Sequence, residues 1–449
     1  MALTFVRALG LAICLLASAA TQSNAAGNAA PVGAAADTLT RFDGRTIERV
    51  ELSGFSTTRR HVIERELHLS AGDPFSAARL RDDLVRLENL GVFSSIDTRV
   101  SESGAGVILL YDFHEMPWIV ALPMAVKTDQ DGWSFGAGVA TLNLAGRAIQ
   151  VGGSVLFGGM NTGGLLLWYP WMTGNHVSLE LLAQRVERDD TFLDFREKSI
   201  EITPWIGRWI GKRWRFRGGV SYLQMRSDAD SVTLAADNRD DLVRVGVALG
   251  VDTRDRWRDP RSGWRGEALV MKTGGALGGD GATWLGELSV ERFQATFRRQ
   301  NLLLYGLAAV QSGEVGRDVP AYLQYRMGGA NSIRGYDVDV LGQEIFGKHQ
   351  LLGTAEYEVL VMPLQEVSMW RFSVSTGLKL AAFVDVGTAW NTESQLRRSR
   401  VRTGYGLGIR WLVPGVNVVR FDIGFSEDGD ARFHIGIADK AGAQRDRLR

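Results

Sequence analysis

From Trp118 onward the sequence alternates apolar residues with small or polar residues, segment after segment. Residues 242–252 show the pattern most clearly: one face carries Val243, Val245, Val247, Leu249 and Val251, and the other carries Arg244, Gly246, Ala248, Gly250 and Asp252. A period of two residues indicates β-strands, and no convincing amphipathic helix appears in this region. A soluble β-sandwich also alternates, so the period alone leaves the fold class open.

The connections between the segments favour a membrane barrel. We expect sixteen strands, which begin near residues 118, 133, 147, 163, 176, 196, 213, 241, 263, 282, 301, 349, 376, 401, 417 and 430. Most short connections alternate with long ones, and the longest spans residues 313–348. Short turns on one side and long loops on the other are typical of outer-membrane barrels, whose strands need about ten residues to cross the bilayer. The connection at 362–375 breaks this rule, and we expect a small plug or a helical turn there.

Aromatic residues near the strand ends fit the girdles of such a barrel. The candidates are Trp168, Tyr169, Trp171, Trp205, Trp209, Trp214, Trp264, Trp390 and Trp411. Taken singly, each one is better explained as an ordinary core aromatic, and only their joint placement favours the girdle. Glycine is also frequent, with 53 residues of 449. We expect many of these glycines on the lumen side or in loops, where close backbone approach is needed.

Composition narrows the function classes. Hydrophobic residues make up 45% and charged residues 23%, which argues against a polytopic helical membrane protein. Lys and Arg number 51 and so do Asp and Glu, so no basic excess points to nucleic acid. The six histidines have no metal-ligand spacing, and Gly152-Gly153-Ser154 lacks the rest of a nucleophile elbow. We therefore expect no enzyme, no cofactor and no metal.

The N-terminus has the features of an exported protein. Residues 1–25 form a predicted signal peptide, with Arg7 before an apolar run at 8–20, and we prefer cleavage after Ala25 to cleavage after Ala19. The only cysteine, Cys14, lies in this segment, so the mature chain would contain no disulfide. Residues 26–40 are a predicted flexible leader, and residues 439–449 a C-terminal tail.

Residues 41–116 predict a small α+β domain before the barrel at 117–438. The expected order is strand, helix, helix, strand, strand, with Thr57 or Thr58 capping the first helix and Ser76 the second. The apolar stripes of two helices can be covered by one face of a three-stranded sheet.

This domain resembles a polypeptide-transport-associated (POTRA) domain through IERVELSGF at 47–55, AGDPFS at 71–76 and VILLYDFHEMP at 107–117. The barrel resembles the BamA/TamA-like outer-membrane assembly and translocation superfamily, also called bacterial surface antigens. The matching pieces are GVDTRDRWRDPRSGW at 250–264, GGANSIRGY at 328–336, and AEYE at 355–358 with FVDVGTAW at 383–390. The chain departs from this family in having one POTRA domain and in Asp439, where a terminal aromatic is usual.

The resemblance implies an ionic lock inside the barrel. It places Arg334, Gly335 and Tyr336 at the tip of the long loop, with Asp385 and Glu356 as acidic partners on the inner wall. Alternation along the strands independently directs both acids into the lumen. On the residues alone, a solvated loop charge is the simpler interpretation of Arg334. His434 is expected to be a plain residue of the lumen wall.

The resemblance also implies a function at the outer membrane of a Gram-negative bacterium, with the POTRA domain in the periplasm. The leading hypothesis is an assembly or translocation factor that takes unfolded client polypeptides from the POTRA domain and inserts or exports them through the barrel. Its partners would be outer-membrane lipid and client chains, and not nucleic acid. The alternatives are a channel plugged by its long loop, and a surface antigen or structural protein that binds a periplasmic protein.

Overall fold

The computed structural model describes residues 39–437, except residues 129, 174–175, 212, 258, 370–371, 399–400 and 414–416. The predicted signal peptide, residues 26–38 of the leader and the tail with Asp439 lie outside the described residues. Within the described part of the chain, no helix has the length and apolar character needed to cross a membrane.

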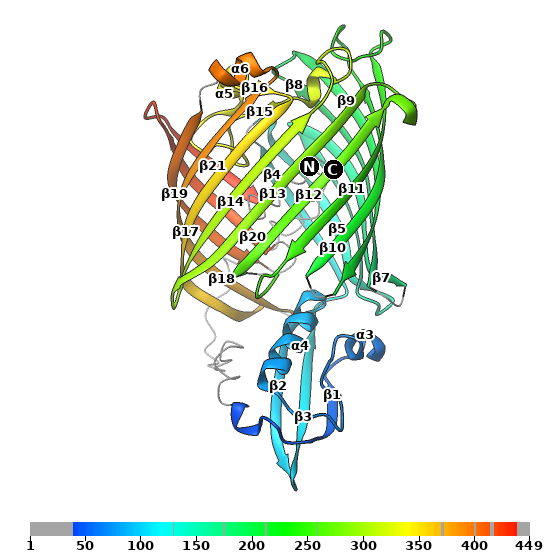
Figure 1. Ribbon diagram of the computed structural model, residues 1–449, viewed down its shortest axis with the longest axis vertical. Helices are drawn as coiled ribbons and strands as arrows, with labels where there is room; N and C mark the ends of the chain where they lie inside the picture. Colours follow the sequence, from blue (N-terminus) through cyan, green and yellow to red (C-terminus); the bar gives the residue numbers. More distant parts are fainter. Residues whose placement is uncertain are drawn as a thin grey trace.

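The N-terminal domain is a three-stranded sheet covered by helices, and it hangs below one end of a large barrel (Figure 1). Its elements are η2 (Thr40–Phe42), β1 (Ile47–Ser53), α3 (Arg60–Glu64), α4 (Ala77–Asn89), β2 (Phe93–Ser103) and β3 (Gly106–Glu115). The sheet order is β1-β3-β2, in which β1 runs parallel and β2 antiparallel to β3. Val107, Leu109, Tyr111 and Phe113 share the buried face of β3 and pack with the helices in one apolar core.

The two helix starts differ from each other. Ser76 caps α4 as expected, because its hydroxyl accepts a hydrogen bond from the Arg79 backbone N–H. The expected cap of the first helix is wrong: α3 follows Arg59 and has no side-chain cap. Thr57 and Thr58 are used elsewhere, in the contact between the two domains.

Sixteen antiparallel strands form the barrel, as expected from the sequence. They are β4 (Ile119–Thr128), β5 (Gly132–Leu144), β6 (Ile149–Gly158), β7 (Met160–Thr173), β8 (Val177–Asp190), β9 (Phe195–Ile210), β10 (Trp214–Arg226), β11 (Arg239–Asp252), β12 (Gly263–Gly274), β13 (Ala282–Phe297), β14 (Gln300–Gln311), β17 (His349–Met369), β18 (Phe372–Trp390), β19 (Arg402–Val413), β20 (Asn417–Ser426) and β21 (Ala431–Ile437). Each pairs with its neighbour in chain order, and β14 pairs with β17 across the long loop.

The side-chain alternation sets which face meets lipid. On β11, Val245, Val247 and Leu249 are exposed on the outside, whereas Arg244 and Ala248 are buried on the inside. The average composition of such a barrel therefore resembles that of a soluble globular protein, because apolar and polar residues alternate along every strand.

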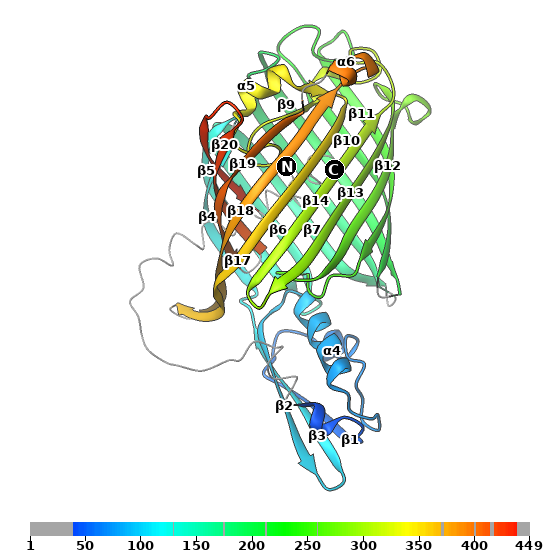
Figure 2. The same ribbon diagram turned by 60° about the vertical axis from the view of Figure 1, so that its left-hand side comes forward.

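Two expectations about the barrel are wrong. The described residues of 362–375 form neither a plug nor a helical turn: β17 and β18 stay paired to Met369 and Phe372 as a long hairpin that bends away from the wall at the lower end of the barrel (Figure 2). Trp205 does not belong to an outer girdle, because it is buried inside the barrel under Arg217. Trp214 and Trp264, in contrast, are half-exposed on the outside.

Most long connections lie at the end of the barrel away from the N-terminal domain (Figure 1). The longest, residues 312–348, contains η4 (Ala321–Leu323), β15 (Tyr325–Arg326), α5 (Val338–Glu344) and β16 (Phe346–Gly347). Shorter helical turns are η3 (Gly275–Leu277) and α6 (Glu393–Arg398). The long loop packs an apolar cluster against the inner wall, which includes Met327, Ile333 and Tyr336 from the loop and Leu307 and Leu352 from strands.

Candidate functional site

The tip of the long loop lies deep in the barrel, where Arg334 has an exposed fraction of 0%. Its guanidinium meets Asp385 of β18 through two parallel hydrogen bonds, Nε to Oδ2 at 2.7 Å and Nη2 to Oδ1 at 2.9 Å. The Arg334 backbone N–H also donates to Asp385 at 3.1 Å. This paired geometry is specific to arginine, because a lysine ammonium cannot bind both carboxylate oxygens in the same plane.

Glu356 of β17 is the second acid that the sequence assigned to the lock. Arg334 Nη1 donates to Glu356 at 3.0 Å and also to Asp422 of β20 at 3.1 Å. Arg410 of β19 then binds both acids, with Nε 2.6 Å from Glu356 and Nη1 2.5 Å from Asp422. The structure thus brings the predicted Arg334, Asp385 and Glu356 together, and adds two partners.

Sequence reasoning missed Asp422 and Arg410, although a signal was present. In RTGYGLGIRW at 402–411, Arg410 falls on the same face as Gly404, Gly406 and Gly408, opposite the apolar residues. A charge on a face of glycines has no apolar neighbours and needs a partner inside the barrel. Arg334, Asp385, Glu356, Asp422 and Arg410 together form the ionic lock, and all five are buried.

Glycines on the wall make room for the loop tip. A methyl group at residue 404 would lie 1.8 Å from the Arg334 carbonyl oxygen, and one at residue 424 would lie 2.4 Å from the Gly335 nitrogen. Gly335 itself has a φ of +95°, which favours glycine, and faces the backbone of Phe425. Part of the glycine surplus is therefore explained by the close approach of two backbones.

The other tip residues contact the last strands. The Gly335 N–H donates to Nε2 of His434 on β21 at 3.0 Å, so His434 is a partner of the loop tip and not a plain wall residue. The Tyr336 hydroxyl donates to the Thr403 carbonyl at 3.2 Å and accepts from the Glu427 N–H at 3.1 Å. The tip is thus bound to five strands, from β17 to β21.

This arrangement can hold a loop in place. Among the described residues, no three His, Cys, Asp or Glu side chains are grouped to bind a metal ion. Removing two charges from water is costly, and the gain from pairing them about offsets that cost. The ionic lock therefore specifies where the loop sits more than it adds net stability, and a single missing partner is expensive because a buried charge remains.

A second set of contacts joins the N-terminal domain to the barrel. The Glu115 carboxylate accepts hydrogen bonds from the backbone N–H groups of Ser56, Thr57 and Thr58. Burial alone would raise the pKa of Glu115, but these bonds and that from the Thr58 hydroxyl outweigh burial and lower the pKa to about 2. Asn143 of β5 donates to the Thr58 hydroxyl at 2.8 Å, which links this cluster to the barrel.

The turn between β5 and β6, which follows Asn143, packs into the core of the N-terminal domain. The Asn143 side-chain oxygen accepts from the Ala148 N–H at 2.8 Å, and Ala148 is fully buried in the apolar core of the N-terminal domain. The Arg59 N–H donates to the Gly146 carbonyl at 2.9 Å. The N-terminal domain therefore packs on the β5–β6 turn of the barrel.

Comparison with known proteins agrees with this architecture. Residues 45–116 match the POTRA family, described as surface antigen variable number repeat, and residues 143–440 match the Omp85 superfamily domain. The outer membrane protein assembly factor BamA of Nitratidesulfovibrio vulgaris is 24% identical over 422 residues, which are 87% of this chain and 50% of that protein. The chain thus spans about half the length of this curated relative.

Solved structures show the same fold. BamA from Haemophilus ducreyi lacking POTRA domains 1–3 aligns with a TM-score of 0.54 and 16% identity, over 86% of this chain and 83% of that one. CdiB from Escherichia coli aligns with a TM-score of 0.59 and 11% identity, over 87% and 75% of the two chains. The chain belongs to the Omp85 superfamily, as a BamA/TamA-like outer-membrane β-barrel that follows one periplasmic POTRA domain.

Proposed function

We propose that this protein is an outer-membrane assembly or translocation factor. Its POTRA domain would capture unfolded client polypeptides in the periplasm, and its barrel would insert them into the outer membrane or export them. The family and the curated relative, an assembly factor, support the general activity. The route of the client through the POTRA domain and the barrel is our own proposal.

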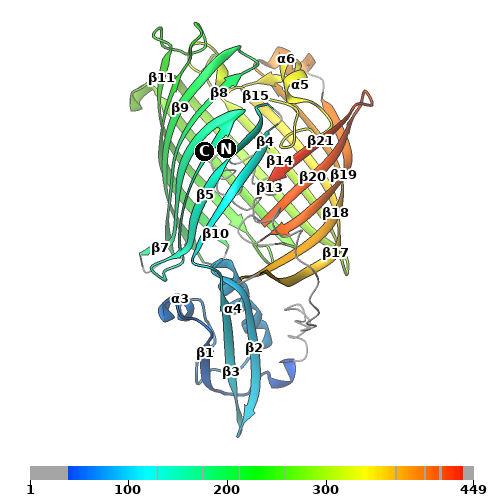
Figure 3. The same cartoon turned by 180° about the vertical axis from the view of Figure 1, so that it is seen from behind.

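One observation carries the proposal: the barrel sheet has two ends. Its order runs from β21 to β4, and among the described residues no pairing joins these two strands (Figure 3). Unpaired backbone N–H and C=O groups are costly inside a bilayer. A seam with two such edges can therefore accept a client strand by backbone hydrogen bonds, which do not depend on the client's sequence.

The POTRA sheet offers a comparable edge to a client in the periplasm. β2 is one of its two edge strands, with eleven residues, and β3 pairs with one side of it. Strand addition at β2 would hold an extended client below the barrel. The POTRA domain packs on the β5–β6 turn, and β5 pairs with β4, which is one edge of the seam. The captured client would therefore be held close to the seam.

Reconstitution tests the assembly role. Lipid vesicles that contain the full protein should speed the folding of an outer-membrane client diluted from urea, relative to empty vesicles. A photo-crosslinker at Ile119 on β4 should capture the client, whereas one at Leu288 on β13 should not, although both side chains are exposed and apolar. If no client folds faster, the insertase version is wrong.

A channel plugged by its long loop is a second candidate. The burial of Arg334 and of the apolar residues Met327 and Ile333 inside the barrel favours it. This version predicts ion conductance that rises when the loop is released, and no effect on client folding.

A further inference from the structure

We propose that Arg326 and Asp190 form a second anchor of the long loop, in addition to the ionic lock at Arg334. The loop is then fixed to two walls of the barrel and crosses the lumen between them. Arg326 belongs to β15 in the loop, and Asp190 ends β8. The inference goes beyond the proposed function, because retention of the loop can be measured without a client. Arg326 and Asp190 would be positioning residues for the loop.

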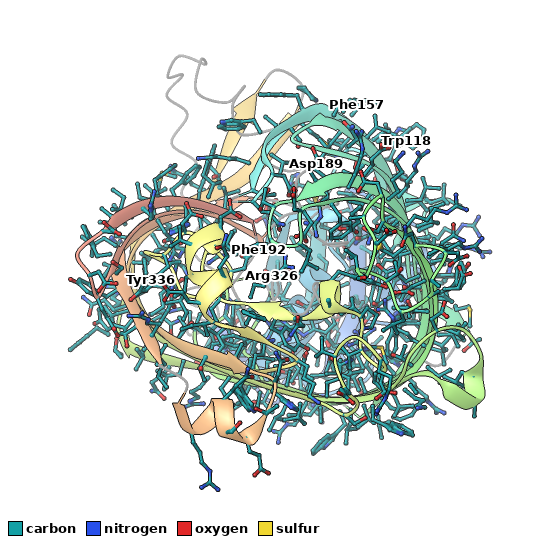
Figure 4. The ribbon with its side chains drawn as sticks, turned by 90° about the horizontal axis from the view of Figure 1, so that it is seen from above. Trp118, Phe157, Asp189, Phe192, Arg326 and Tyr336 are labelled. Carbon is teal, nitrogen blue, oxygen red and sulfur yellow. The ribbon has the colours of Figure 1, made fainter. Side chains whose placement is uncertain are left out.

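The second anchor is a defined ion pair. Arg326 Nη1 donates to both oxygens of Asp190, at 2.9 and 3.2 Å. The guanidinium carbon also lies 3.9 Å from the ring centroid of Phe192, which is a favourable cation–π contact. Viewed from above, Arg326 and Phe192 lie side by side toward the middle of the barrel mouth, and Tyr336 lies nearer to the wall (Figure 4).

The β8–β9 turn is built to present this carboxylate. Asp190 Oδ1 accepts hydrogen bonds from the backbone N–H groups of Phe192 at 2.9 Å and Leu193 at 3.0 Å. The turn holds Asp190 in place without help from the loop, so the acceptor is preorganised. An arginine arriving from the loop gains a charge-assisted hydrogen bond with little ordering cost.

The same turn also holds the helix of the loop. The Thr191 hydroxyl donates to the Asp339 carboxylate in α5 at 3.0 Å. Gly342 of α5 packs on the Phe192 ring so closely that an added methyl group would lie 2.9 Å from it. Three independent contacts thus fix β15 and α5 to one turn, which is more than a chance surface ion pair provides.

The two anchors lie on distant walls. In the sheet order, β8 is eight positions from β18, the strand of Asp385, in a sheet of sixteen strands. Arg326 and Arg334 are only eight residues apart (334 − 326 = 8), which limits their separation to about 29 Å. The segment between them, residues 327–333, is therefore a short bridge tied at both ends.

This bridge has space on one side. Gly328, Ala330 and Asn331 line a cavity of about 380 Å³, together with Arg326 and Asp190. When one anchor opens, the other still limits how far the bridge can move into the cavity. Loss of one anchor would free only one end of the bridge, whereas loss of both would free both ends.

Planar-bilayer conductance of the full protein tests this coupling. We expect Arg326→Met and Arg334→Met each to change conductance only slightly, and the double variant to raise it by on the order of tenfold more than the product of the single effects. Arg196→Met is the control, because it breaks an exposed ion pair with Glu187 between the same two strands, β8 and β9. Single effects that simply multiply, or full opening by Arg326→Met alone, would overturn the two-anchor proposal.

A milder variant covers the case that Arg326→Met does not fold. Asp190→Asn keeps an oxygen for the Phe192 and Leu193 N–H groups but removes the charge, and it should show the same coupling to Arg334→Met. Client folding is measured in parallel in vesicles with the same variants. Coupled conductance without faster client folding would support the two anchors and reject the assembly role. Conductance effects that simply multiply, together with faster client folding, would reject the two anchors and support the assembly role.

Discussion

The substitution Gly404→Ala tests the close packing of the loop tip against the wall without changing any charge of the ionic lock. The added methyl group would lie 1.8 Å from the Arg334 carbonyl oxygen and 3.0 Å from its carbonyl carbon. Both neighbours are backbone atoms, so no side chain can rotate away. An ordinary contact begins near 3.4 Å, and the loop tip must therefore retreat by about 1.6 Å (3.4 − 1.8).

That retreat is large compared with the tolerance of the ionic lock. The hydrogen bonds of Arg334 to its three acids span 2.7–3.1 Å, and a hydrogen bond is lost beyond about 3.5 Å. Overpacking alone costs about 1–3 kcal/mol. Separation of the buried pairs costs about 3–5 kcal/mol, so we expect the locked state to be destabilised by about 3 kcal/mol or more.

Two measurements follow the change. The first is the urea midpoint of the protein in lipid vesicles, read from its heat-modifiable migration. The second is trypsin cleavage after Arg334, mapped by mass spectrometry, because this buried residue is cut only when the tip leaves the lumen. Gly306→Ala on β14 is the control, since nothing lies within 4 Å of its added methyl group. A Gly404→Ala protein with the midpoint of the control and no cut after Arg334 would refute the close-packing argument.

Three further predictions concern the ionic lock and the domain contact. Arg334→Asp and Asp385→Arg should each lower the urea midpoint and the amount of protein in the membrane, and the double swap should restore part of both; single variants that match wild type would remove the lock. Asn143→Ala deletes the bonds to Thr58 and Ala148, so proteolysis between the POTRA domain and the barrel should accelerate while the barrel midpoint stays the same. The pKa of Glu115 is about 2 in the folded protein and about 4.3 when unfolded. The contribution of its carboxylate to the folding free energy is therefore complete above pH 4.3 and is lost as the pH falls toward 2. Pepsin cleavage near residues 56–59, divided at each pH by the cleavage of an unfolded reference peptide, should increase across this range. Glu115→Gln should abolish the pH dependence of this ratio, and an unchanged dependence would contradict the assignment.

Most of the fold could be predicted from sequence because its signals are local. A strand that separates lipid from lumen must alternate, and each expected strand start near 163, 263 or 349 lies close to an observed one. The N-cap at Ser76 is equally local. The misplaced cap at Thr57 or Thr58 shows the limit: their backbone groups bind Glu115, more than fifty residues away, and no local pattern records that competitor.

The sequence by itself determined the sixteen strands, the inward direction of Asp385 and Glu356 and, by resemblance, the loop tip that meets them. Only the tertiary structure decided the rest of the lock and the second anchor. Asp422 and Arg410 lie on strands that follow the loop tip by about eighty residues, and Asp190 precedes it by more than a hundred. Alternation says which face a residue occupies, but curvature of the sheet decides which residues meet across the lumen. That curvature is a property of all sixteen strands together.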